Sequence, residues 1–228
     1  MGRLRTIVAT LAAGLAVAAC NDSTNPAANS AQLRVVQAVP ASPTLDVLLD
    51  GGVLVQDLAA GSFVPYRLVT AGARKVDVTT SDGTPVASTT ATLLDQSSYT
   101  LLIAGTVGAV DVKLFTDDIQ LPPTDKTKLH VVQASPAEGT VDVYVTAPGA
   151  DLTTATPTFA GVTFETSTDT RIIPAGSYQV RVTPAGSKIA DIDAGTLMFN
   201  SGQVQTVFVV DKTGGGKPGT VAVVLDNF

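Results

Sequence analysis

The sequence predicts an all-β protein with two tandem antiparallel β-sandwich domains that follow a cleaved signal peptide. Three observations predict it. Valine, threonine, glycine and proline are abundant and tryptophan is absent, a long stretch of sequence occurs twice, and apolar residues recur at every second position. This composition disfavours helices and favours strands joined by tight turns. Immunoglobulin-like packing is the preferred arrangement, and a partly closed barrel is the main alternative.

The N-terminal segment has the layout of a secretory signal. Arg3 and Arg5 precede the uncharged run Thr6–Ala19, which ends in small residues just before Cys20. A helix that crosses a membrane needs about 20 apolar residues, so this run is too short to remain as a span. Residues 1–19 are therefore expected to be a signal peptide that is removed.

Cys20 is the only cysteine, so no disulfide can form within the chain. The run Val17-Ala18-Ala19-Cys20 resembles a bacterial lipobox, and this resemblance implies cleavage before Cys20 and acylation of its thiol and of the new amino terminus. More than one acyl chain makes membrane attachment effectively permanent. A free thiol is the alternative. The chain is therefore expected to be a lipoprotein whose membrane attachment is through Cys20.

Residues 20–30 are expected to form the lipidated cysteine and a flexible tether, because they are polar and cannot bury enough apolar surface to fold. Lipoproteins with aspartate directly after the cysteine tend to stay at the inner membrane, and here that position is Asn21. The expected location is the cell envelope outside the cytoplasm, at the outer membrane if the source has two membranes.

The charge of the chain limits its partners. The full sequence has a net charge of −6, and loss of Arg3 and Arg5 with the signal peptide makes the mature chain more acidic. An acidic chain lacks the basic surface that binds phosphate backbones, so nucleic acid is not expected as a partner. Electrostatic binding to anionic lipid is equally unfavourable, which leaves the acyl chains as the membrane attachment.

A duplication determines the predicted domain organisation. Residues 33–49 align with residues 129–145, and more than half of the aligned positions are identical. The correspondence continues for about 90 residues, which is longer than the period of a solenoid repeat. Two domains are therefore expected, at residues 31–120 and 126–228, joined by the short, stiff segment Leu121-Pro122-Pro123-Thr124-Asp125.

Within each copy, apolar and polar residues alternate, as in residues 110–114 and 178–183. Such alternation buries one face of a strand and exposes the other, and about seven short strands are expected in each copy. Turns are expected at Asp50-Gly51-Gly52, Ala71-Gly72, Asp82-Gly83, Ala185-Gly186, Asn200-Ser201-Gly202 and Gly214-Gly215-Gly216. The disulfide and core tryptophan of antibody domains are missing, but a domain of this size can close a core of valine, leucine, isoleucine and phenylalanine.

Three segments carry a family resemblance: Arg34–Pro40, Leu45–Gly51 and Ala175–Gly186. They resemble the bacterial domain-of-unknown-function (DUF) family 4397, whose members typically read R-V-V-H-A-S-P, V-D-V-Y-V and P-A-G-x-Y-x-V. Two tandem copies would cover nearly the whole mature chain. The resemblance implies secreted or surface-anchored β domains and brings no established reaction. Gln37 and Gln133 stand where the family often has histidine, so any metal or proton-transfer role of that histidine is absent.

His130 is the only histidine and occupies the position of Arg34 in the repeat. It alternates with Leu129 and Val131, so it is expected on the wetter face of a strand. A catalytic role would need a nucleophile and an orienting acid that converge on it. The sequence contains no Gly-x-Ser-x-Gly motif to supply that nucleophile.

Asp46 and Asp142 occupy equivalent positions in the two copies, each between apolar residues. Because a charge inside a strand is costly to bury, each carboxylate is expected to accept amide protons from a turn or a neighbouring strand. Contact with a ligand is the alternative.

Two acidic pairs, Asp117 with Asp118 and Asp191 with Asp193, could offer oxygens to calcium. Calcium takes six to eight oxygen ligands, and neither pair fits an EF-hand loop, so no metal or other cofactor is expected. The segment Gly214–Gly219 superficially resembles a phosphate-binding loop, but Pro218 replaces the serine or threonine and no helix follows. A hairpin tip between strands Val204–Val210 and Thr220–Leu225 is expected instead.

The sequence contains no recognisable catalytic constellation. The expected function is therefore that of a non-enzymatic, lipid-anchored envelope protein for binding, adhesion or scaffolding, with cell-wall polysaccharide or a surface protein as its partner. Two linked copies could raise the avidity for a repetitive target. The alternative is an envelope glycan-acting enzyme that uses aspartate carboxylates, but no pair with the required separation of about 5–9.5 Å can be named. A solute-capture lipoprotein fits poorly, because such proteins are usually hinged α/β structures.

Overall fold

The computed structural model describes residues 29–227 as an all-β chain with seventeen strands in four sheets and no helix. Within this range no helix exists that could span a membrane. The predicted signal peptide, Cys20 and the tether up to residue 28 lie outside the described residues.

Eight strands form the first two sheets, in the orders β4-β1-β7-β8 and β3-β2-β5-β6. Their bounds are β1 (Ser30–Gln37), β2 (Leu45–Leu49), β3 (Gly52–Leu58), β4 (Phe63–Thr70), β5 (Gly72–Thr80), β6 (Pro85–Leu93), β7 (Ser98–Thr106) and β8 (Ala109–Asp117). We call these strands the N-terminal half.

Nine strands form the other two sheets, in the orders β11-β10-β14-β15 and β12-β9-β16-β17, with β13 also paired to β9. Their bounds are β9 (Lys126–Gln133), β10 (Val141–Thr146), β11 (Phe159–Val162), β12 (Thr166–Ser167), β13 (Arg171–Pro174), β14 (Gly176–Pro184), β15 (Ile192–Phe199), β16 (Val204–Val210) and β17 (Thr220–Leu225). We call these strands the C-terminal half.

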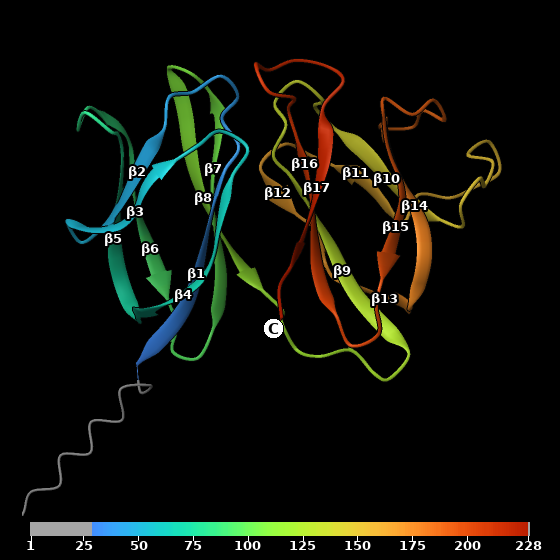
Figure 1. The fold of residues 1–228 in the computed structure, drawn as a ribbon, viewed down its shortest axis with the longest axis horizontal. Coiled ribbons are helices and arrows are strands. Elements are labelled where there is room, and N and C mark those ends of the chain that lie inside the picture. The colour runs from blue at the N-terminus through green and yellow to red at the C-terminus, as the bar shows by residue number, and fades with distance from the viewer. Residues whose placement is uncertain (1–28, 228) are drawn as a thin grey trace, which may run out of the picture.

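Each half encloses its own apolar core between its two sheets (Figure 1). In β1, Leu33 and Val35 face the first core, and in β9, Leu129 and Val131 face the second. This is the alternation that the sequence predicts, because successive side chains of a strand point to opposite faces of the sheet.

The two halves also pack against each other, so that the four sheets stack in layers (Figure 1). The sheet that contains β1 and β7 faces the sheet that contains β9 and β16, and a third apolar cluster lies between them. Its buried members are Val36, Ala38, Leu102, Ala104, Val132, Ala134, Phe208, Val210 and Val224. The central strands of the molecule are therefore buried on both faces, and β7 is buried from Ser98 to Gly105.

The prediction of purely antiparallel sheets is wrong at two pairings. Strand β1 runs parallel to β7, with Arg34 opposite Thr100, and β9 runs parallel to β16, with His130 opposite Thr206. The other pairings between described strands are antiparallel. An alternating pattern reveals the faces of a strand but not its direction. A parallel neighbour also requires a long crossover, which the strands between β1 and β7 provide.

The hairpin predicted around the glycine-rich segment is confirmed. Strands β16 and β17 have the expected bounds and pair antiparallel. Gly214, Gly215 and Gly216 between them have φ angles of 90°, 87° and 82°. Such angles suit glycine because it has no Cβ to clash with the backbone. The segment is therefore a turn rather than a phosphate-binding loop.

Candidate functional site

Equivalent residues of the two copies meet between the halves. In each set, a basic residue of the first strand lies opposite a threonine, and that threonine donates a hydrogen bond to an aspartate that ends the next strand or directly follows it. The first set is Arg34, Thr100 and Asp117, and the second is His130, Thr206 and Asp226. The threonine-to-aspartate bonds are 2.6 and 2.7 Å long. The two halves thus share one hydrogen-bond scheme at this interface.

Arg34 is the centre of this interface and is only 1% exposed. It forms an ion pair with Asp226 of the other half, and its Nη2 lies 3.7 Å from Asp117 Oδ2. The guanidinium also donates to Thr100 at 2.7 Å and to Thr206 at 3.0 Å. The Arg34 guanidinium therefore interacts with a carboxylate from each half, Asp117 and Asp226. Loss of one partner in such a buried pair is strongly destabilising, because a charge is left uncompensated.

Aromatic rings and a third hydroxyl complete the environment of Arg34. The guanidinium carbon lies 4.9 Å from the centre of the Tyr66 ring and 5.4 Å from that of Phe208. Tyr66 donates a 2.6 Å hydrogen bond to Asp117, and burial raises the pKa of the Tyr66 hydroxyl. Burial also raises the pKa of Asp226 to about 6 and raises the pKa of Asp117, while Arg34 lowers both.

The predicted exposure of His130 is wrong, because the face opposite the core is covered by the other half. His130 is 3% exposed, and its Nε2 lies 3.3 Å from Thr206 Oγ1. Burial lowers the pKa of His130 to about 4, so the ring is neutral at neutral pH. The Thr206 hydroxyl donates its proton to Asp226, so it is not a nucleophile activated by His130.

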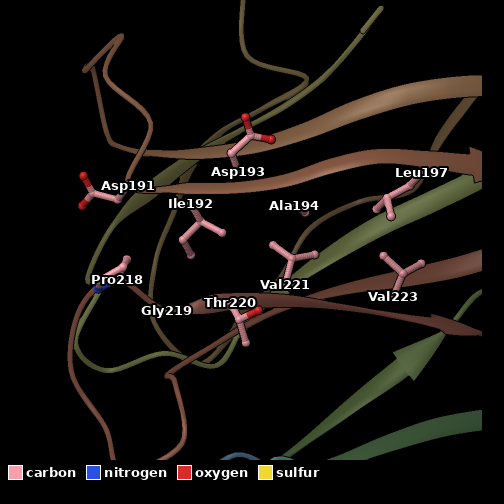
Figure 2. A pocket seen from close by; sticks show the side chains of 10 residues that line it. All are labelled: Asp191, Ile192, Asp193, Ala194, Leu197, Pro218, Gly219, Thr220, Val221 and Val223. Atoms are coloured by element: carbon pink, nitrogen blue, oxygen red, sulfur yellow. The ribbon is translucent and has the colours of Figure 1, made fainter. Parts of the chain in front are cut away.

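An open groove of about 680 Å³ lies between β15 and β17 (Figure 2). Both strands are at the edges of their sheets, so the side of the C-terminal half is open between them. The apolar lining consists of Ile192, Ala194, Leu197, Pro218, Val221 and Val223. The lining includes no aromatic side chain.

The corresponding place in the N-terminal half, between the starts of β6 and β8, holds a cavity of only about 100 Å³. Val86 and Val110 contribute to its walls and pack against the core of that half. The two halves thus differ at this position, and the open groove belongs to the C-terminal half.

The predicted acidic pair Asp191 and Asp193 lies at the rim of the groove, with both carboxylates turned away from its apolar floor (Figure 2). Asp191 is 3.1 Å from the amino group of Lys217. Asp193 accepts 2.8 Å hydrogen bonds from Gln179 and from the amide of Gly195, and the bond from Gln179 is the main cause of its lowered pKa. The two carboxylates therefore have separate partners and do not form a shared site.

The carboxylates of Asp117 and Asp118 also have separate partners. Asp117 is buried beside Arg34, whereas Asp118 accepts a 2.9 Å bond from Lys128. Within residues 29–227, no group of three or more histidine, cysteine or acidic side chains is arranged to hold a metal ion.

The predicted roles of Asp46 and Asp142 are confirmed. Asp46 accepts the amide proton of Asp57 at 2.8 Å. Asp142 accepts those of Gly161 at 2.7 Å and Gly186 at 2.8 Å. Asp57 and Gly161 have φ angles of 51° and 63°, and the pairing of β2 with β3 and of β10 with β11 is irregular beside them. Each carboxylate thus stabilises an irregular edge strand in its own half.

Gln37 and Gln133 have a structural role that the sequence reasoning missed. Both side chains are completely buried. Each side-chain oxygen accepts a 2.7 Å bond from a backbone amide two residues later, of Val39 or Ser135. The side-chain amide of Gln133 also donates to the carbonyl of Gly139 at 2.6 Å. The recurrence of glutamine at the end of an apolar strand was the available signal.

A search of the curated proteins finds no match to this chain. Among solved structures, the chain is similar to a family 26 carbohydrate-binding module from Eubacterium rectale in complex with maltoheptaose, with 8% identity, a TM-score of 0.25 and coverage of 86% of this chain and 96% of the other. It is also similar to family 41 carbohydrate-binding modules from streptococcal virulence factors, with 12% identity, a TM-score of 0.26 and coverage of 86% and 97%. A candidate adhesin from Bacteroides ovatus matches with 10% identity, a TM-score of 0.23 and coverage of 87% and 94%. Similarity at such TM-scores carries no inference about the ligand of this chain.

The family described as "Domain of unknown function (DUF4397)" matches residues 31–144, from β1 to within β10. The matched range includes Arg34, both glutamines and both strand aspartates. Because the match covers half of the sequence, the chain belongs to the DUF4397 family.

Proposed function

We propose that this chain is a lipid-anchored envelope protein that binds an extended segment of another surface protein and catalyses no reaction. In this proposal the two halves are tandem immunoglobulin-like β-sandwich domains, at residues 31–120 and 126–228. The lipobox-like run before Cys20 supports the anchor, and the repeated hydrogen-bond scheme supports the duplication.

The observation that carries the binding function is the open groove between β15 and β17. Strand β17 pairs only with β16 among the described strands, so its other edge can accept an added strand. Alternate side chains of a peptide on that edge would lie over Val221 and Val223. Asp193 has no ion-pair partner among the described residues, which favours a lysine or arginine in the peptide.

The alternative of a glycan-acting enzyme has no support from the positions of the aspartates. Glycoside hydrolysis requires two carboxylates that face each other across the bond to be cleaved. At the groove, Asp191 is paired with Lys217 and Asp193 is held by Gln179, and both point away from the floor (Figure 2).

The packing of the halves also changes the expected mode of binding. The halves share a buried interface that includes Val36 and Phe208, so they form one body rather than two modules on a linker. At the two equivalent places compared in the described residues, the C-terminal half has a groove of about 680 Å³ and the N-terminal half a cavity of about 100 Å³. We therefore expect one peptide site per chain, and the avidity of two equivalent sites is not part of the proposal.

Substitution of Val223 by lysine is expected to abolish peptide binding, because it places a charge on the apolar lining of the groove. The measurement is selection of a phage-displayed random peptide library on the protein, followed by titration of the selected peptides. Wild-type protein should select peptides with alternating apolar residues and a lysine or arginine. Val53→Lys is the control, because Val53 is 57% exposed on β3 of the other half. Equal binding to both variants would contradict the groove as the site.

Substitution of Cys20 by serine is expected to abolish acylation and to release the protein from the membrane fraction, because serine has no thiol to acylate and membrane affinity comes from the buried acyl chains. The measurement is metabolic labelling with an azide-bearing palmitate, together with fractionation of the cells. Ser23→Ala is the control, since it changes a nearby tether residue and keeps the thiol. Retention of the label in Cys20→Ser would show that the lipid is attached elsewhere.

A further inference from the structure

A polar crevice of about 390 Å³ lies at the boundary between the two halves, apart from the groove. The end of β8 contributes one wall, β9 contributes the floor, and the segment that joins β12 to β13 contributes the other wall. The lining residues are Thr116, Asp118, His130, Ser167, Thr168, Asp169 and Thr170. The crevice thus includes the only histidine of the chain.

His130 has a hydrogen-bonding position that the protein leaves unused. Its Nδ1 is buried and has no hydrogen-bond partner among residues 29–227. Its other ring nitrogen, Nε2, contacts Thr206 on β16, which lies on one side of β9. The segment with Thr168 and Asp169 follows β12 on the opposite side of β9, where the crevice lies. A buried polar atom without a partner costs about 1–3 kcal/mol, so a partner supplied from the crevice would be favourable.

The two halves also differ in the acidic partner of this basic position. In the N-terminal half the basic residue, Arg34, lies beside the aspartate of its own half. In the C-terminal half the equivalent aspartate, Asp226, is paired with Arg34 across the interface. Among the described residues, His130 has no hydrogen bond to a carboxylate, and Asp118 on the crevice wall interacts with it only electrostatically. His130 is part of the crevice lining, so its imidazole lies next to the space that a ligand would occupy.

The chemistry of the lining selects a class of ligand. The lining has four hydroxyl groups and a neutral imidazole, which can donate or accept hydrogen bonds. The Thr168 hydroxyl already accepts from the amide of Val131 and donates to the carbonyl of Asp169, so the hydroxyls of Thr116, Ser167 and Thr170 are the ones offered to a ligand. The carboxylates of Asp118 and Asp169 disfavour an anion, and Lys128, the nearest cation to Asp118, is already paired with it. The volume lies at the lower end of the range of small-molecule pockets, which is about 300–1,000 Å³.

From these observations we infer that the crevice binds a neutral, polyhydroxylated ligand of one or two sugar rings, with a ligand hydroxyl bonded to His130 Nδ1. This site is separate from the peptide groove. A negative result for sugar binding would therefore leave the peptide-binding proposal unaffected. The ligand class follows from the hydroxyl-rich lining and the absence of an unpaired cation among its described residues.

The single histidine provides a direct test. The whole protein, labelled with ¹⁵N in histidine, is titrated with maltose and with N,N′-diacetylchitobiose while the two imidazole nitrogen resonances of His130 are followed by NMR. The expected result is a saturable shift, larger at Nδ1 than at Nε2, with at least one of the two sugars. Absence of a saturable shift with both sugars at tens of millimolar would overturn the inference, since a dissociation constant of 1 mM corresponds to only about 4 kcal/mol of binding.

Two variants and one anionic probe make the test specific. Asp169→Ala removes an exposed carboxylate from the lining and is expected to weaken sugar binding about tenfold, as loss of one hydrogen bond would. Asp151→Ala, in the loop between β10 and β11, is the control and should bind as the wild type does. Glucuronate should not compete with the neutral sugar. Equal weakening in both variants, or equal binding of glucuronate, would contradict the assigned site or its ligand class.

Discussion

Replacement of Arg34 by methionine is expected to lower the free energy of unfolding by about 3–5 kcal/mol, because it leaves buried carboxylates without their cation. Arg34 is fully enclosed and interacts with Asp226 and Asp117 from different halves. Methionine preserves much of the apolar volume beside Phe208. The decrease in unfolding free energy is therefore due mainly to loss of the guanidinium charge. Urea unfolding of both proteins at one pH measures the difference.

The penalty of Arg34→Met is expected to be larger at pH 8 than at pH 5. Burial raises the pKa of Asp226 from 3.8 to about 6 in the folded protein. A carboxyl with a raised pKa favours the folded state at low pH, and this contribution is lost as the pH rises through about 6. Arg34 lowers the pKa of Asp226 and of His130. Its removal raises both pKa values. At pH 5 a larger fraction of Asp226 is then protonated and uncharged, so the variant loses less stability than at pH 8.

Two further proteins separate the loss of charge from a general loss of packing. Arg67→Met is the control, because Arg67 is exposed on β4 and donates only to the carbonyl of Leu54. It should change stability by less than about 1 kcal/mol. The double variant Arg34→Met with Asp226→Asn removes one of the carboxylates that Arg34→Met leaves without a cation. It should therefore recover part of the lost free energy of unfolding. If Arg34→Met were no less stable than Arg67→Met, the buried ion pair would not hold the halves together.

Substitution of Asp142 by alanine is expected to cost about 3 kcal/mol, because one buried carboxylate satisfies two backbone amides. Asp142 is 6% exposed and accepts the amide protons of Gly161 and Gly186. Loss of the side chain leaves both amides without that acceptor and removes the support of the irregular β11 edge. The measurement is the midpoint and slope of urea unfolding.

The equivalent residue of the other half provides a matched control. Asp46 is only partly buried and accepts one amide proton, that of Asp57. Asp46→Ala is therefore expected to cost about 1 kcal/mol, less than Asp142→Ala. A larger effect at Asp46 would contradict the view that the number of satisfied amides and their burial determine the role of this repeated aspartate.

Several features could be predicted from the sequence because they depend on nearby residues. The hairpin between β16 and β17 follows from two apolar runs separated by glycines that accept positive φ angles. The roles of Asp46 and Asp142 follow from the cost of a charge within an apolar strand, which requires a backbone donor close by. The all-β class follows from the amino-acid composition and from the recurrence of apolar residues at every second position.

The positions of Arg34 and His130 could not be predicted in this way. Alternation shows that both side chains leave the core of their own half, and this part of the prediction is correct. It does not show what covers the other face. In this protein the other half of the chain covers that face, so residues expected at a solvated surface form a buried network.

The sequence by itself determined the strands, the turns, the duplication and the local hydrogen bonds, because each depends on side-chain period or on neighbours along the chain. Only the tertiary structure decided that the halves join face to face, that Arg34 pairs with Asp226 of the other half, and that a wide groove opens between β15 and β17. These features depend on contacts between residues far apart in the chain, and a pattern of alternating polarity contains no information about which surfaces meet.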